Sequence, residues 1–91
     1  MYILTQDGMR IVPFGERDSI SIEEDRKFEE EDKAYADGQT VYHIWLYGEI
    51  RTVVGSFADE LDAKAALTNI YRAIRLGCNI VEIYRDPKVE V

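Results

Sequence analysis

Two apolar segments on either side of a short turn constrain the fold more than any other part of the chain. Residues 41–47 and 50–57 are rich in β-branched and aromatic side chains, and the dipeptide Gly48-Glu49 separates them. Glycine at the first central position is typical of a two-residue type II′ turn, which joins antiparallel strands. The sequence therefore predicts a β-hairpin over Thr40–Phe57.

A two-residue turn also predicts which side chains share a face of this hairpin, because side chains alternate along a strand. One face then carries Tyr42, Ile44, Leu46 and Val53, and the opposite face carries Val41, His43, Trp45 and Tyr47. Both faces are largely apolar, whereas an antiparallel sheet with one solvated face alternates more sharply. Each face therefore needs a covering element or a partner.

The segment after the hairpin has the pattern of an amphipathic helix over Asp59–Leu76. Its apolar stripe recurs at helical spacing and consists of Ala63, Ala66, Leu67, Ile70, Ala73 and Ile74. Asp59 is a favourable N-cap, and Gly77 is typical of the left-handed residue that ends a helix. We expect this helix to pack on the Tyr42/Ile44/Leu46/Val53 face of the hairpin.

Shorter strand patterns surround these two elements, at residues 2–5, 10–14, 19–22 and 79–84. The tripeptide Gln6-Asp7-Gly8 supplies turn chemistry, and Pro13 favours an edge or a strand end. The predicted fold class is α+β: an antiparallel sheet of four to five strands with one principal C-terminal helix packed on one face. A chain of 91 residues is expected to form a single domain, 1–91.

An acidic segment at 23–38 interrupts these patterns. Seven of the ten residues from Glu23 to Asp32 are acidic, and no wide apolar face accompanies them. We expect a mobile, solvated excursion with some helical character. A divalent-cation site would draw on Glu23, Asp25, Glu29 and Asp32. The run lacks the ligand order of a calcium loop, so no metal site is predicted.

The charge balance narrows the classes of partner. Eighteen acidic and 11 basic residues give a formal net charge of −7. This balance disfavours direct binding to nucleic acid, whose affinity for proteins comes largely from Lys and Arg. It also disfavours anionic membrane surfaces. Basic proteins, or metals held by carboxylates, remain open as partners.

The single cysteine, Cys78, excludes an intramolecular disulfide and a cysteine zinc cage. It follows the predicted helix end, where the negative end of the helix dipole disfavours a reactive thiolate. We expect it to be a small buried or semi-buried apolar residue. No secretory signal pattern is present, and the longest apolar stretch, residues 41–47, is too short to span a bilayer. The predicted location is cytoplasmic.

No catalytic pattern is found in the sequence. Phosphate-binding glycine loops and a G-x-S-x-G elbow are absent. His43 is the only histidine, and no nucleophile is adjacent to it in the sequence, so a histidine packed on a sheet face is the better interpretation. We therefore expect no enzyme, no catalytic residue and no cofactor.

A family resemblance appears in the opening Tyr2-Ile3-Leu4-Thr5-Gln6-Asp7 with Arg10-Ile11-Val12, and in Val54-Gly55-Ser56-Phe57 followed by Asp59-Glu60. The chain resembles small uncharacterised proteins of phages and prophage-like regions, which open with a similar Ile-Leu-Ser/Thr-Gln-Asp strand. The resemblance covers about half the chain. It implies an accessory protein of a mobile element, without a catalytic residue.

Two interpretations of the face that carries His43, Trp45 and Tyr47 stay open. Either the segment 25–36 or another strand layer covers it, or it is a partner or homodimer surface, since aromatic residues are enriched at interface cores. The predicted function is non-catalytic protein binding with self-association. The alternative is an acidic inhibitor that mimics nucleic acid and binds a nuclease or DNA-binding protein through Glu29, Glu30 and Glu31.

Overall fold

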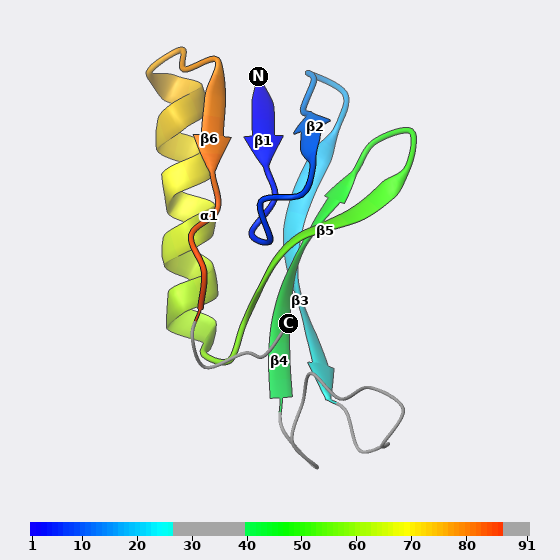
Figure 1. The fold of residues 1–91 in the computed structure, drawn as a ribbon, viewed down its shortest axis with the longest axis vertical. Helices are drawn as coiled ribbons and strands as arrows, with labels where there is room; N and C mark the ends of the chain where they lie inside the picture. Colours follow the sequence, from blue (N-terminus) through cyan, green and yellow to red (C-terminus); the bar gives the residue numbers. More distant parts are fainter. Residues whose placement is uncertain (27–39, 87–91) are drawn as a thin grey trace.

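The strands and the helix follow one another in the predicted order. The computed structural model describes residues 1–26 and 40–86 (Figure 1). The elements are β1 (Tyr2–Leu4), β2 (Ile11–Pro13), β3 (Ser19–Arg26), β4 (Thr40–Tyr47), β5 (Arg51–Phe57), α1 (Glu60–Arg75) and β6 (Ile80–Glu82). The α+β class is therefore confirmed, with α1 as its principal helix.

The strands form two three-stranded sheets, so the predicted single sheet of four to five strands is wrong. One sheet has the order β2-β1-β6 and the other has the order β3-β4-β5. The chain returns from α1 as β6, which pairs with β1 in parallel rather than antiparallel. A helical crossover permits this parallel pairing, because it carries the chain back to the same end of the sheet. Pro13 ends β2 at the sheet edge, as predicted.

Both sheets and the helix share one core. Ile3 and Val12 come from the first sheet, Ile44 and Leu46 from the second, and Ile70 from α1; all of them are at most 6% exposed. Helix α1 contacts β3, β4 and β5 as well as β6. The helix and the sheet β2-β1-β6 therefore cover the same face of the sheet β3-β4-β5.

The register of the β4–β5 hairpin differs from the predicted one. Tyr47 pairs with Arg51, so the connection has three residues, and a register shift follows between Ile44 and Trp45. Val53 consequently lies beside Trp45, on the face away from the helix, while Val54 is in the core and 1% exposed. The predicted helix-facing set was correct for Tyr42, Ile44 and Leu46, and wrong for Val53. The third residue in the connection reverses the faces of residues 51–53 relative to the prediction, and the bulge restores the predicted faces from Gly55 onward.

Strand β3 extends into the segment predicted to be a mobile excursion. Residues 23–26 continue the ladder, with Glu23 opposite His43 and Asp25 opposite Val41. The prediction was wrong there because β4 is eight residues long and offers pairing partners along its whole length. The rest of the acidic segment, residues 27–38, lies outside the described residues.

Helix α1 ends as its sequence predicts. Gly77 has a φ of 70°, and its N–H donates to the carbonyl of Ile74, while the N–H of Cys78 donates to that of Ala73. This pair of bonds is a Schellman motif, which requires a left-handed residue at the position of Gly77. The side chain of Cys78 is exposed, contrary to our expectation, because it follows the turn and lies outside the core. At the other end, Asp59 precedes the helix but makes no side-chain capping bond.

A substitution in the helix tests the core. Ile70 is 1% exposed, so Ile70→Asp should bury an unpaired charge and lower the free energy of unfolding by at least about 3 kcal/mol. Leu61→Asp is the matched control, because Leu61 lies on the same helix and is 75% exposed. Chemical denaturation of both variants checks the assignment. Near-wild-type stability of Ile70→Asp would contradict it.

Gly55 provides a second test, of the contact between the hairpin and the C-terminal segment. A Cβ atom at Gly55 would lie 2.8 Å from Cγ2 of Ile83, and Ile83 is itself 3% exposed. Gly55→Ala should therefore destabilise the fold by about 1–3 kcal/mol through overpacking. At Gly15 the nearest atom to a new Cβ is 3.7 Å away, so Gly15→Ala should change the melting temperature little. Equal melting temperatures for both variants would refute this contact.

Candidate interaction surface on the outer sheet face

The sheet β3-β4-β5 has a second face, directed away from the helix, which we call the outer face. Strand pairing places on it Ser19, Ser21, Glu23 and Asp25 from β3, Val41, His43, Trp45 and Tyr47 from β4, and Arg51, Val53 and Ser56 from β5. All three predicted partner-binding residues of the hairpin lie on this face. Its exposure varies along β4: Val41 and His43 are buried, whereas Trp45 and Tyr47 are only partly buried.

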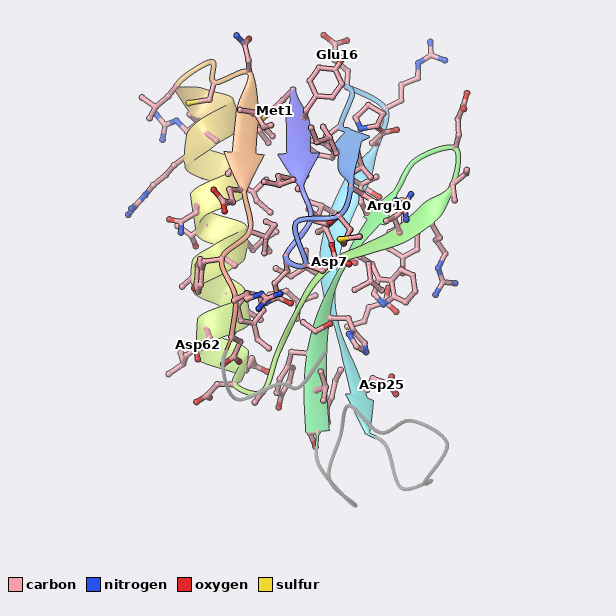
Figure 2. All side chains as sticks on the ribbon, in the orientation of Figure 1. Met1, Asp7, Arg10, Glu16, Asp25 and Asp62 are labelled. Atoms are coloured by element: carbon pink, nitrogen blue, oxygen red, sulfur yellow. The ribbon has the colours of Figure 1, made fainter. Side chains whose placement is uncertain are left out.

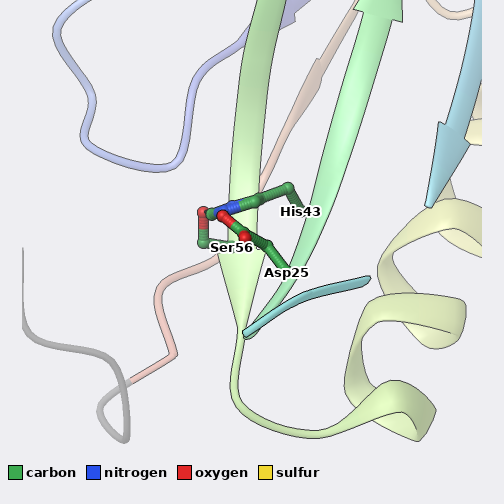
Figure 3. A network of polar contacts seen from close by, with 3 residues as sticks. All are labelled: Asp25, His43 and Ser56. Atoms are coloured by element: carbon green, nitrogen blue, oxygen red, sulfur yellow. The ribbon is translucent and has the colours of Figure 1, made fainter. Parts of the chain in front are cut away.

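One row of the outer face joins three polar residues across the three strands (Figure 3). Nε2 of His43 lies 3.2 Å from Oδ2 of Asp25, and its Nδ1 lies 2.7 Å from Oγ of Ser56. Since a carboxylate only accepts, the Nε2–H donates to Asp25, and in the neutral ring Nδ1 accepts from the Ser56 hydroxyl. Both ring nitrogens of a histidine that is 9% exposed are thus hydrogen-bonded.

Three rings of β4 contact one another along the strand on the outer face. We call them the aromatic row: His43, Trp45 and Tyr47. The His43 and Trp45 rings lie edge to face with centroids 6.4 Å apart, and the Trp45 and Tyr47 centroids are 6.3 Å apart. The guanidinium of Arg51 lies 4.3 Å from the Trp45 ring centroid and 5.4 Å from that of Tyr47. Such cation–π contacts hold the rings and the cation in one arrangement before any partner arrives.

Gln6 fixes the neighbouring edge of β5. Its backbone N–H donates to the carbonyl of Val54, and its side-chain amide accepts from the N–H of Ser56 and donates to the Ser56 carbonyl, at 2.8, 2.8 and 2.9 Å. The side-chain amide of Gln6 therefore pairs with Ser56 as a peptide group of an adjacent strand would. The same Nε2 donates to the carbonyl of Tyr84 at 3.1 Å.

The turn before β2 holds Gln6 in place. Asp7 accepts from the Thr5 hydroxyl at 2.6 Å and from the N–H of Met9 at 2.9 Å, and these bonds, with Arg10 nearby, hold the pKa of Asp7 below its ordinary value. Figure 2 labels Asp7 and Arg10 at this turn. The Gln6-Asp7-Gly8 turn was predicted, and Gly8 adopts a φ of 72° there.

Sequence reasoning missed Asp25, Arg51 and Ser56 as members of this surface. The predicted register placed Val54 opposite His43 and Arg51 opposite Leu46, whereas the three-residue connection places Arg51 opposite Tyr47 and the bulge places Ser56 opposite His43. The remaining predicted partner-binding residues, Glu29, Glu30 and Glu31, lie outside the described residues. Of the suggested cation ligands, Glu23 and Asp25 lie on β3, and Glu29 and Asp32 lie outside the described residues.

Two further properties bear on this surface. Within residues 1–26 and 40–86, no group of three or more His, Cys, Asp or Glu side chains is placed to hold a metal ion. In the same residues, no helix is long and apolar enough to cross a membrane.

In comparisons with known proteins, the chain matches no family model and shows no significant similarity to a curated protein or a solved structure.

The role of Gln6 can be tested directly. Gln6→Leu keeps the size of the side chain but leaves the N–H and carbonyl of Ser56 without their partner, so the free energy of unfolding should fall by about 1–3 kcal/mol. Asn69→Leu is the control, because Asn69 is an exposed amide on α1. Urea denaturation measures both variants. A Gln6→Leu variant as stable as Asn69→Leu would show that the hydrogen bonds of the Gln6 side chain contribute little to the stability of the fold.

Proposed function

We propose that this protein is a non-catalytic protein-binding module whose aromatic row contacts the partner. The observation that carries the proposal is the stack of Arg51 on Trp45, 4.3 Å from the ring centroid, on a sheet face where Trp45 and Tyr47 stay partly exposed. Trp, Tyr and Arg are the residue types that dominate binding energy at protein interfaces. A stack formed in advance also lowers the entropic cost of binding.

The contacts of Ser56 support the non-catalytic part of the proposal. Asp25, His43 and Ser56 contain the groups of a Ser-His-Asp triad, but acyl transfer also needs hydrogen-bond donors directed at the developing oxyanion. The N–H of Ser56 already donates to Gln6, and Ser56 lies within β5, not on a sharp turn. Asp25 and Ser56 therefore satisfy the two ring nitrogens of the buried His43 and hold its ring, which is the first ring of the aromatic row.

The proposal further includes that the protein associates with itself and that it originates in a mobile element. The aromatic row is a surface that two copies can share, and the opening strand carries the phage-like pattern. The alternative, an acidic inhibitor that mimics nucleic acid, depends mainly on Glu29, Glu30 and Glu31. These residues lie outside the described part of the chain, so the alternative stays a prediction from the sequence.

A capture experiment with matched variants tests the aromatic row. Immobilised wild type and Trp45→Ala are incubated with lysate of the native host, and the affinity of any captured protein is then measured. Trp45→Ala should weaken that complex by at least tenfold, because it removes both the indole and the platform of Arg51. Leu61→Ala, at a residue 75% exposed on α1, should bind as the wild type does. Equal affinities for all three proteins would refute the aromatic row as the contact surface.

Sedimentation of the wild type separates a homodimer from a different partner. A species near twice 10.5 kDa that becomes monomeric in Trp45→Lys would identify the aromatic row as a homodimer interface. A monomer whose Trp45 fluorescence is shielded from quenchers would instead favour a covered face.

A further inference from the structure

A groove lies between the helix and the first half of β3. Its volume is about 380 Å³, and it is lined by Ile20 of β3 and by Leu67, Thr68, Ile70, Tyr71 and Ile74 of α1. Ile70 is buried, whereas Tyr71 and Ile74 are 57% and 45% exposed. The groove therefore has an apolar lining that solvent reaches from one side, with enough volume for a bulky side chain.

Strand β3 presents a free edge beside this groove. It is the outermost strand of its sheet and pairs with β4 over all eight residues. Among the described residues, the backbone of residues 19–24 makes no hydrogen bond with a segment other than β4. Its ladder has no bulge, and its first half, residues 19–22, carries neither proline nor a charged side chain. Bulges, proline and charged side chains protect exposed edges in natural proteins, so this half of the edge is open to a further strand, whereas the charged half from Glu23 onward restricts which strand can add.

The side chains of β3 determine what an added strand would meet. Ile20, Ile22 and Glu24 share the helix-facing side, opposite Leu46, Ile44 and Tyr42 of β4, while Ser21 and Glu23 lie on the outer face. Because side chains alternate along a strand, an added strand would place one side chain in the groove beside Ile20. A side chain four residues away on the same side would lie beside Glu24.

The charge of this edge selects the partner. Glu23 and Glu24 follow Ile22 directly, and the whole chain carries −7. Lysine or arginine opposite these carboxylates is attracted, whereas an acidic segment, including a second copy of this strand, would bring like charges together. Apolar and basic residues are therefore the complement of this edge.

We propose that the edge of β3 and the groove beside it bind an extended segment of a partner protein by antiparallel strand addition. That segment carries a bulky aliphatic residue for the groove and basic residues three and four positions before it. Main-chain hydrogen bonds to β3 supply affinity, and the groove and the two glutamates supply specificity. The strand edge and the groove lie apart from the aromatic row, so this inference goes beyond the proposed function and does not depend on it.

A synthetic peptide tests the proposal. The probe is acetyl-Thr-Lys-Lys-Val-Thr-Leu-Thr-amide, whose lysines would lie opposite Glu24 and Glu23 and whose leucine would lie opposite Ile20. Titration followed by amide NMR shifts should show saturable binding, with the largest shifts in residues 19–24 and 67–74. Tyr71→Ala should weaken binding at least tenfold, while Leu61→Ala, on the same helix but outside the groove, should not change it.

Variants of the peptide test the mode of binding. N-methylation of one alternate set of amides, those directed at β3, should abolish binding, whereas methylation of the other set should be tolerated. Replacing the leucine by aspartate, or both lysines by glutamate, should each cost at least tenfold, and the loss from the lysine change should shrink at high salt. Equal tolerance of both methylated sets would overturn strand addition.

Three further outcomes would each overturn the proposal of strand addition at β3. A probe that loses affinity in Trp45→Ala but not in Tyr71→Ala would bind the aromatic row, which would overturn this proposal and support the proposed function. A wild-type homodimer that dissociates in Tyr71→Ala would show that a second copy occupies the edge, which would also overturn it. No binding at millimolar peptide would refute the groove as a binding site for an added strand, and it would not bear on the function proposed for the aromatic row.

Discussion

The arrangement of the two sheets depends on one junction, where Gln6 pairs with the edge of β5. A backbone N–H and a side-chain amide together continue the hydrogen bonding of β5 beyond its last partner strand. Edges of sheets need such cover, because unpaired peptide groups cost free energy when buried. The same junction fixes Ser56, and through Ser56 the ring of His43. The packing of the sheets and the order of the aromatic row thus have a common origin.

Local patterns predicted the elements well, because each depends on neighbours in the sequence. The helix, its end at Gly77 and the hairpin strands follow from apolar spacing and turn chemistry. The pairing of strands was harder to predict. The parallel contact of β1 with β6 joins residues almost eighty positions apart, and no local pattern encodes it. The bulge near Val54 likewise depends on the core around it. The longer connection brings Arg51 beside Tyr47 and the bulge brings Ser56 beside His43, and neither pairing was predicted.

The two proposed surfaces belong to the same sheet but use different physical means. The aromatic row offers rings and a cation that are already stacked, and it suits a partner with a formed surface. The edge of β3 offers peptide groups, an apolar groove and two carboxylates, and it suits an unstructured segment that becomes ordered when it binds. A single partner with a folded part and a basic tail could engage both surfaces, because only β4 lies between the edge strand β3 and Arg51 on β5.

The pairing of β1 with β6 also determines when the fold can form. Ile3 and Ile83 belong to one core, and β1 lies between β2 and β6. During synthesis, the β1–β2 hairpin is made before the other strands and the helix, but β1 obtains its second neighbour only after α1 and β6 have followed. Contacts between such distant segments slow folding, because a long loop must close before they form. The central strand of this sheet is thus made before the other elements and is among the last to be completely paired.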